Sequence, residues 1–221
     1  MTIIIPNKRA RDMIAARLQS VANQTCQEDI KLQEHQITSR IGKALELELR
    51  RRNILGHRIR VITHDLPDKG RRSLEKPIGA DLYVGFELVG GGESRSKGIL
   101  VQAKKAKSMD AGQVKRLKGQ CRDMLGKTDA AYVWTYSENG IISQEAESFD
   151  RLGPLARRTG PADVFASILE CTKGDPKLGL PPTSDVAEAR EQLHGKLKDL
   201  AVGTGIFALL ERPDHPTQRR L

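Results

Sequence analysis

The hydrophobic period of the chain changes from helical to extended near residue 57, and this change constrains the fold most strongly. Between residues 29 and 52, apolar side chains recur on one helical face, at Ile37, Ile41 and Leu45. From His57 to Ile62, polar and apolar residues alternate as they do in a half-buried strand. The sequence therefore predicts helices that pack on a sheet.

Helix and strand patterns alternate over the first 136 residues, with turn residues between them. Turns are expected at residues 67–70 and at the glycines of residues 90–92. We expect helices over residues 6–24, 29–52 and 111–125, and strands over 57–62, 81–88, 98–104 and 131–136. This order predicts an α/β fold in which helices flank a central mixed sheet.

The pattern changes after residue 150. A short helix over residues 161–172 is followed by a Pro/Gly-rich loop, a helix that begins near residue 185 and a strand over 205–210. We therefore predict a core over residues 1–150 and a mainly helical C-terminal extension over residues 151–221 that packs on it.

The charge of the chain points to a polyanionic partner. There are 37 Lys and Arg residues against 28 Asp and Glu, which gives a formal net charge of +9. Nucleic acid is the simplest partner for such a chain, and an anionic membrane surface is the weaker alternative. Aromatic residues make up only 4% of the sequence, so stacking platforms for single strands are not expected.

The sequence also predicts a cytoplasmic protein without a membrane segment. Its three cysteines are far apart and form no CxxC pair, which fits a reducing compartment. The longest apolar run, residues 206–210, has the length of a strand and falls far short of the ~18 residues of a membrane span.

The residues that suggest chemistry lie where two predicted strands begin and end. Asp81 opens the strand 81–88, and Gln102 and Lys104 close the strand 98–104. In a hairpin, the start of one strand lies beside the end of its neighbour, so Asp81 and Lys104 converge at one sheet edge. Gln102 and Lys104 are two residues apart and share a face of the sheet. A carboxylate, an amide oxygen and an ammonium group gathered in this way suit a hard divalent cation with an activated water.

Each of these residues also has an ordinary structural explanation. Gly-Ala-Asp is a common way to open a strand, so Asp81 taken alone is equally consistent with a turn or a cap. Lys104 belongs to a basic run with Lys105 and Lys107, which is typical of a solvated surface. The placement of Asp81, Gln102 and Lys104 at strand ends, in this order, favours a site.

The helix predicted over residues 29–52 carries carboxylates on its apolar stripe. On a helical wheel, Glu34 and Glu48 fall at about 60° and about 20° from Ile37, inside the stripe, whereas Glu46 falls opposite at about 180°. A carboxylate on a buried stripe is costly unless something pairs with it. These glutamates are therefore further candidates for the site.

Gly79-Ala80-Asp81 followed by Gln102-Ala103-Lys104, with Glu34 on the preceding helix, resembles the PD-(D/E)xK (restriction endonuclease-like) nuclease superfamily. The QxK form of the motif is similar to that of modification-dependent restriction endonucleases and anti-phage effector nucleases. The resemblance covers residues 28–145. It implies that residues 1–150 form a restriction endonuclease-like core.

The resemblance also implies a role for each matching residue. Asp81 would be the principal metal ligand, Gln102 would occupy the second acidic position, and the main-chain carbonyl of Ala103 would add a ligand. Lys104 would be the catalytic lysine. Gln102 is neutral where many members have Asp or Glu, so Glu34 is expected to complete the metal shell.

The helix glutamate is open among three residues, which we rank Glu34, Glu48 and Glu46. Glu46 belongs to the segment 42–46, which resembles the helix of archaeal Holliday-junction resolvases in the same superfamily. That likeness leaves a structure-selective junction nuclease as one alternative function. A non-catalytic DNA-binding protein that retains the nuclease fold is another, because the neutral Gln102 leaves the site short of charge.

The function expected from the residues and the resemblance is hydrolysis of DNA phosphodiester bonds by a Mg²⁺-dependent endonuclease, with Mn²⁺ as an alternative metal. The substrate would be double-stranded DNA held by its backbone, and the biological role would be restriction or anti-phage defence. The resemblance further implies a homodimer or a larger assembly. Because the sequence has no evident sensor domain, a sensor partner protein is also expected.

Overall fold

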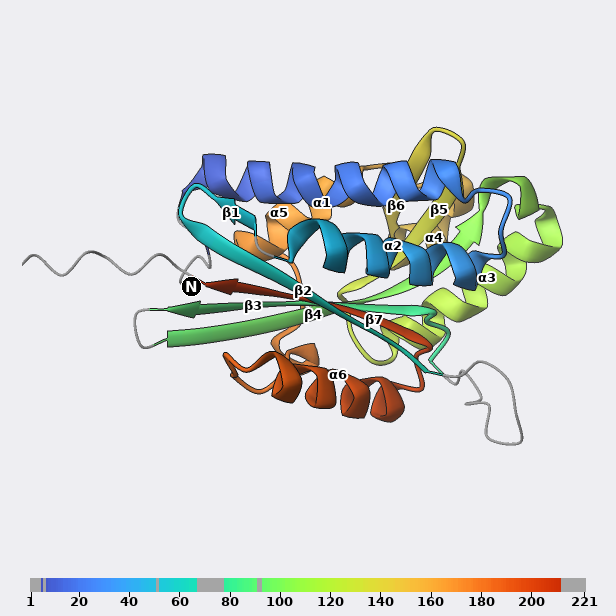
Figure 1. The fold of residues 1–221 in the computed structure, drawn as a ribbon. Helices are drawn as coiled ribbons and strands as arrows, with labels where there is room; N and C mark the ends of the chain where they lie inside the picture. The colour runs from blue at the N-terminus through green and yellow to red at the C-terminus, as the bar shows by residue number, and fades with distance from the viewer. Residues whose placement is uncertain (1–4, 6, 51, 67–77, 91–92, 212–221) are drawn as a thin grey trace, which may run out of the picture.

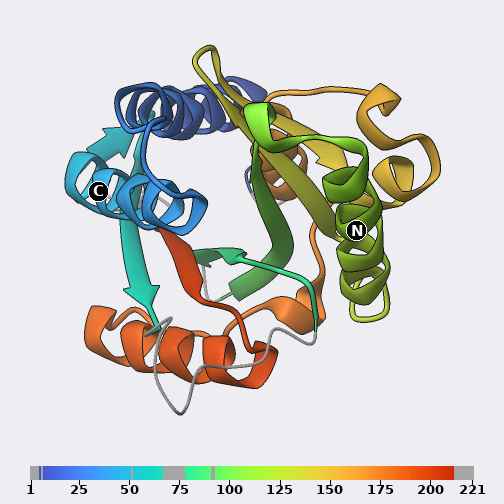
Figure 2. The ribbon, with the colours of Figure 1, turned by 90° about the vertical axis from the view of Figure 1, so that its right-hand side faces the viewer.

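The computed structural model describes residues 5, 7–50, 52–66, 78–90 and 93–211. Over these residues the chain forms an α/β fold with a seven-stranded mixed sheet in the order β1-β2-β7-β3-β4-β5-β6. Helices lie on both faces of this sheet (Figures 1 and 2). The α-helices are α1 (Lys8–Glu28), α2 (Glu34–Leu49), α3 (Ala111–Leu125), α4 (Ala146–Leu152), α5 (Pro161–Leu169) and α6 (Val186–Leu200). The strands are β1 (Arg52–Ile54), β2 (His57–Asp65), β3 (Leu82–Gly90), β4 (Glu93–Lys105), β5 (Ala131–Ser137), β6 (Gly140–Glu145) and β7 (Thr204–Glu211).

The last strand of the chain lies in the middle of the sheet. β7 pairs antiparallel with β2 on one side and parallel with β3 on the other (Figure 1). Its residues are almost all buried, which suits its apolar sequence, because a central strand covered on both faces carries no polar alternation. The part of the chain after residue 150 thus supplies a central strand as well as two helices.

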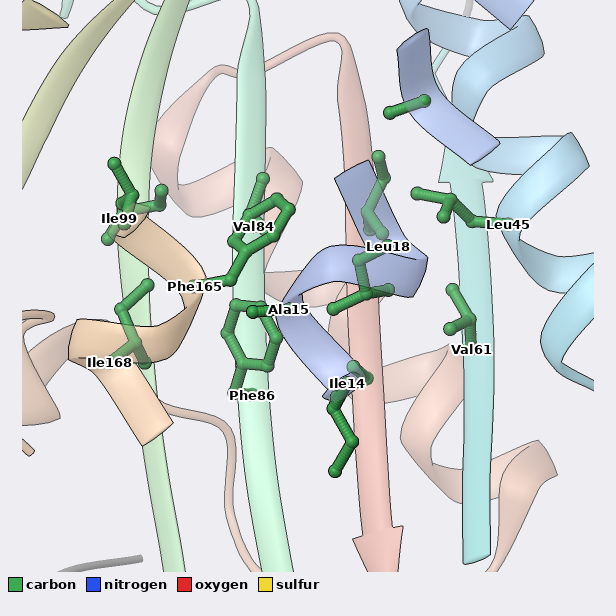
Figure 3. Packing of buried hydrophobic residues seen from close by; sticks show 14 of the residues in the cluster. Ile14, Ala15, Leu18, Leu45, Val61, Val84, Phe86, Ile99, Phe165 and Ile168 are labelled. Carbon is green, nitrogen blue, oxygen red and sulfur yellow. The ribbon is translucent and has the colours of Figure 1, made fainter. Parts of the chain in front are cut away.

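The sheet separates two hydrophobic clusters. On one face, α1, α2 and α5 cover the sheet, and Figure 3 shows Leu18 of α1, Leu45 of α2 and Phe165 of α5 packed over the strands. On the other face, α3, α4 and α6 cover residues such as Phe207 and Val133. The core is mainly aliphatic, as a chain with few aromatic residues requires.

The predicted helix over residues 29–52 was wrong at both ends. α1 extends to Glu28, and α2 begins at Glu34 after a turn, with a capping box between Gln33 and Gln36 that closes its first turn. At the other end, residues 52–54 form the strand β1. A tight connection through Leu55 and Gly56, both with positive φ, turns this strand back into β2.

Two elements after β5 were not predicted. Gly140 adopts a φ of +101°, which allows a tight hairpin from β5 into β6, and α4 follows directly. The turn expected at residues 67–70 and part of the glycine turn at 90–92 lie outside the described residues. No helix in the described ranges is long and apolar enough to cross a membrane.

A buried glutamate in β3 is the most unusual polar group of the core. Glu87 is fully buried; its Oε1 accepts hydrogen bonds from Ser94 Oγ at 2.6 Å and from the Thr183 amide at 3.2 Å. Its Oε2 is buried without a hydrogen-bond partner among the described residues. Burial raises the pKa of Glu87 above the ordinary value of a glutamate, and the nearby Glu188 acts in the same direction.

We predict that Glu87→Gln makes the protein less sensitive to alkaline pH. A carboxyl group with a raised folded-state pKa binds more protons when folded, so its stabilising contribution is present at acid pH and is lost as the pH rises. The variant should therefore gain about 1 kcal/mol of unfolding free energy relative to wild type between pH 5 and pH 8. Urea unfolding at both pH values measures this difference, and parallel pH dependence of the two proteins would contradict it.

Candidate functional site

The register of β3 and β4 places Asp81 beside Gln102. Leu82 pairs with Val101, and the amide of Asp81 donates a hydrogen bond to the Val101 carbonyl at 3.0 Å. The side-chain amide Nε2 of Gln102 donates to Oδ2 of Asp81. Gln102 is buried and Asp81 is partly exposed, so the pair lies at the boundary between the core and solvent.

Lys104 and Glu34 form an ion pair at the same edge of the sheet. Lys104 Nζ lies 3.0 Å from Oε2 of Glu34, and the side chains are 17% and 26% exposed. The other oxygen of Glu34 accepts a hydrogen bond from the main-chain amide of Lys105 at 2.9 Å. The first residue of α2 is thereby fixed to the end of β4, and the ammonium group of Lys104 has a defined position.

Three of these four residues line one open cleft, and Gln102 is buried. Glu34, Asp81 and Lys104 all line a cleft of about 500 Å³ at the end of the sheet. The remaining lining residues are Lys31, Leu32, Gln33, His35, Lys105 and Ser108. Two carboxylates and a lysine from three separate elements therefore face the same solvent-filled space.

The cleft holds two carboxylates, Asp81 and Glu34, and both oxygens of Glu34 already accept hydrogen bonds, from Lys104 and from the Lys105 amide. Oε1 of Gln102 is buried and has no hydrogen-bond partner among the described residues, and the amide nitrogen of this side chain, not Oε1, contacts Asp81. The Ala103 carbonyl lies 3.2 Å from Gln102 Nε2. Within the described ranges, no three His, Cys, Asp or Glu side chains are grouped to hold a metal. A cation at this cleft would rely on Asp81, Glu34 and neutral amide oxygens, which are ligands that Mg²⁺ accepts.

The other two candidate glutamates of α2 lie away from the cleft. Glu48 is about half exposed and pairs with Arg17 of α1 at 2.8 Å, so its predicted inward position was wrong. Glu46, predicted to face away, accepts hydrogen bonds from Thr63 of β2 and forms an ion pair with Arg190 of α6 at 2.6 Å. Both carboxylates tie α2 to neighbouring elements.

A buried hydroxyl pair that the sequence did not indicate joins α2 to β5. Tyr136 of β5 is fully buried, and its hydroxyl lies 2.8 Å from Oγ1 of Thr38. Burial raises the pKa of Tyr136, so the phenol stays neutral at physiological pH. Thr38 Oγ1 also donates to the main-chain carbonyl of Glu34 at 2.9 Å, so the pair links the start of α2 to β5.

Sequence reasoning also missed Asp65, which lies close to the cleft. Asp65 ends β2, and its carboxylate accepts hydrogen bonds from Ser39 Oγ at 2.6 Å and Thr204 Oγ1 at 3.0 Å. It lines a small second cleft together with Asp81 and His35. The strand was predicted only over residues 57–62, so the sequence pattern did not place Asp65 at this sheet edge; β2 extends to Asp65. Asp65 lies one strand farther from Asp81 than a direct pairing of β2 with β3 would place it, because β7 lies between these two strands.

No protein-family model matches this chain, and the searches of curated proteins and of solved structures return no match either.

Proposed function

We propose that this protein is a metal-dependent nuclease that hydrolyses phosphodiester bonds at the cleft of Asp81 and Lys104. The observation that carries the proposal is the convergence of Glu34, Asp81 and Lys104 on one cleft, with Gln102 hydrogen-bonded to Asp81. Residues 34 and 104 are 70 positions apart in the chain, so a solvated surface run does not account for their pairing.

The cation site of this nuclease would be built from oxygen atoms. We assign Asp81 as the principal ligand, with the side-chain amide oxygen of Gln102, the carbonyl of Ala103 and the carboxylate of Glu34 as the further donors. Mg²⁺ meets these requirements, and Mn²⁺ accepts the same oxygen ligands. When bound, the cation would polarise the scissile phosphate and lower the pKa of a coordinated water.

Lys104 would supply the positive charge that the protein itself brings to the reaction. Its ammonium group faces the cleft and is held by Glu34 at 3.0 Å, so it needs no reorganisation to meet charge that develops on a phosphate oxygen. In the reaction, water forms a new P–O bond, the bond to the leaving oxygen breaks, and the leaving oxygen takes up a proton. Lys104 would orient the water and stabilise the pentacovalent transition state.

DNA is the substrate that the composition favours. The chain carries a net charge of +9, and exposed basic residues follow the site in sequence along α3, as a phosphate-binding surface requires. The sequence resemblance supports four further parts of this proposal. They are the restriction or anti-phage role, the restriction endonuclease-like core, the homodimer and the sensor partner.

Supercoiled plasmid DNA tests the proposal. Wild-type protein with Mg²⁺ or Mn²⁺ should convert the plasmid to nicked and linear forms, and EDTA should stop the conversion. Parallel reactions with linear duplex, a four-way junction and RNA define the substrate class. Faster cleavage of the junction than of linear duplex would favour the structure-selective alternative.

A non-catalytic DNA-binding protein is the second candidate function. The observation that favours it is the neutral Gln102 at the position where many nucleases of this kind carry a carboxylate, together with the lack of a group of three ligating side chains in the described ranges. Such a protein would bind DNA equally with and without metal and would leave every substrate intact. Calorimetric titration with Mn²⁺ separates the two candidates.

A further inference from the structure

A second, larger groove begins beside the candidate site and runs along α2. It has a volume of about 920 Å³ and lies between α2, the outer edge of β2 and α6. Its lining residues are Lys43, Glu46, Leu47, Arg50, Arg58, Arg60, Val61, Ile62, Thr63, His64, Asp65, Val186 and Arg190. We refer to this space as the α2 groove.

The α2 groove and the candidate site form one continuous surface. The small cleft that contains Asp65 shares this residue with the α2 groove, and it shares Asp81 and His35 with the cleft of the candidate site. Helix α2 borders all three spaces, with Glu34 at one end and Arg50 just beyond the other. The separation along the helix is about 24 Å, at about 1.5 Å per residue.

The charge of the groove is strongly positive. Five Lys or Arg side chains line it, against the two carboxylates of Glu46 and Asp65. Both carboxylates have hydrogen-bond donors from the protein, namely Arg190 and Thr63 for Glu46, and Ser39 and Thr204 for Asp65.

Two of the five cations are available to a ligand. Lys43 of α2 and Arg50, the residue that follows α2, are exposed, and neither has an ion-pair or hydrogen-bond partner among the described residues. Arg58 and Arg60 pair with Glu211, and Arg190 pairs with Glu46. His64 adds no charge at neutral pH, because burial and the neighbouring His194 lower its pKa.

The open edge of β2 is blocked against a peptide strand. β1 covers β2 only at residues 57–59, so the outer side from Arg60 onward has no neighbouring strand in the described part of the chain. At Thr63, however, the amide donates to Oε2 of Glu46 at 3.2 Å and the carbonyl accepts from Arg190 at 2.7 Å. At Thr63, in the middle of this edge, the main-chain groups that a peptide strand would pair with are thus already used.

We infer that the α2 groove binds the phosphate backbone of the nucleic-acid strand that leads away from the candidate site. The inference rests on the proposed function and specifies where its substrate lies. The path of about 24 Å from Glu34 at the candidate site to Arg50 in the groove corresponds to about seven base pairs of duplex, at about 3.4 Å of helix axis per pair. Lys43 and Arg50 contact phosphates, and the paired arginines fix the walls of the groove.

Charge reversal at two residues tests this inference. The groove variant carries Lys43→Glu and Arg50→Glu, and the matched control carries Arg157→Glu and Arg158→Glu. The control residues are exposed and lie next to Thr159, which bridges to β6 at the opposite edge of the sheet. Both variants have the same net charge, so general electrostatic attraction is equal in the two proteins.

Binding of fluorescent duplex and single-stranded DNA is measured in EDTA over a range of salt concentrations. The groove variant should bind on the order of 10- to 100-fold more weakly than the control, with a salt slope smaller by about two. The duplex and single-strand arms show which form of the backbone the groove prefers.

Equal affinity of the groove variant and the control would overturn the inference. The inference would also be overturned if the groove variant bound DNA as the control does but no longer bound an extended acidic peptide. Because the assay contains no catalytic metal, its outcome is separate from cleavage. Wild-type protein that binds through the groove but never cuts DNA would refute the nuclease proposal and leave the groove assignment intact.

Discussion

Replacing Lys104 with methionine should reduce the rate of plasmid cleavage by on the order of 10³-fold. The substitution keeps most of the length and the apolar character of the side chain, which is 17% exposed, and removes the ammonium group that Glu34 holds. Preorganised charge at a developing phosphorane contributes about 10²- to 10³-fold, and help with proton transfer adds to this. Mn²⁺ binding should persist, because Lys104 is not among the assigned ligands.

Lys107→Met provides the matched control for this experiment. Lys107 lies three residues later in the same basic run, is 82% exposed and pairs with Glu138 on the surface. If Lys104 belonged to a solvated basic run, the two variants would lose activity equally. The proposed function expects the Lys107 variant to cleave at nearly the wild-type rate, and equal loss in both variants would refute the role of Lys104.

Replacing Gln102 with glutamate should make the stability of the protein depend on metal. The new carboxylate would lie against Asp81 in a buried position, where the wild-type amide donates a hydrogen bond. An uncompensated buried charge typically costs about 3 kcal/mol or more, so in EDTA at neutral pH the variant should unfold at lower temperature than wild type. A divalent cation at 100 times its Kd would restore about 2.7 kcal/mol.

Gln144→Glu separates metal binding from a general effect of charge burial. Gln144 is also buried in the sheet, but its amide donates to the main-chain carbonyl of Ala156 at 2.8 Å, away from the candidate ligands. Both variants should be destabilised in EDTA, and thermal unfolding with Mn²⁺ should recover only the Gln102 variant. Recovery of both or of neither would contradict a metal site at Asp81 and Gln102.

Local sequence patterns predicted much of the fold, because the hydrophobic period depends only on neighbouring residues. The helices over residues 111–125 and near 186–200 and the strands around 57–65, 82–90 and 131–137 follow from this period. The place of β7 between β2 and β3 did not follow, because strand order depends on contacts between residues more than 100 positions apart. Short elements such as β1 and β6 depend on glycine turns and have too few residues for a clear pattern.

The candidate site was predictable where it depends on a single hairpin. The pairing of β3 with β4 fixes Asp81 beside Gln102, and this register follows from two consecutive strands. The partner of Lys104 was harder to predict, because it depends on where α2 begins. The helical wheel placed Glu34 and Glu48 on the same stripe. Glu34 reaches β4 because it is the first residue of α2, whereas Glu48 pairs with Arg17 of α1. Packing between helices, which the sequence does not encode locally, decides between the two glutamates.

The most direct test of a metal-dependent nuclease centre is plasmid cleavage by wild type and Asp81→Asn in Mg²⁺, with DNA binding of both proteins measured in EDTA. Asparagine keeps the shape of the side chain and removes the charge of the principal ligand. The proposal predicts that wild type cuts the plasmid, and that the variant binds DNA normally but cuts it at least about 10²-fold more slowly. Cleavage by the variant at the wild-type rate, or an intact plasmid with the wild-type protein, would contradict it.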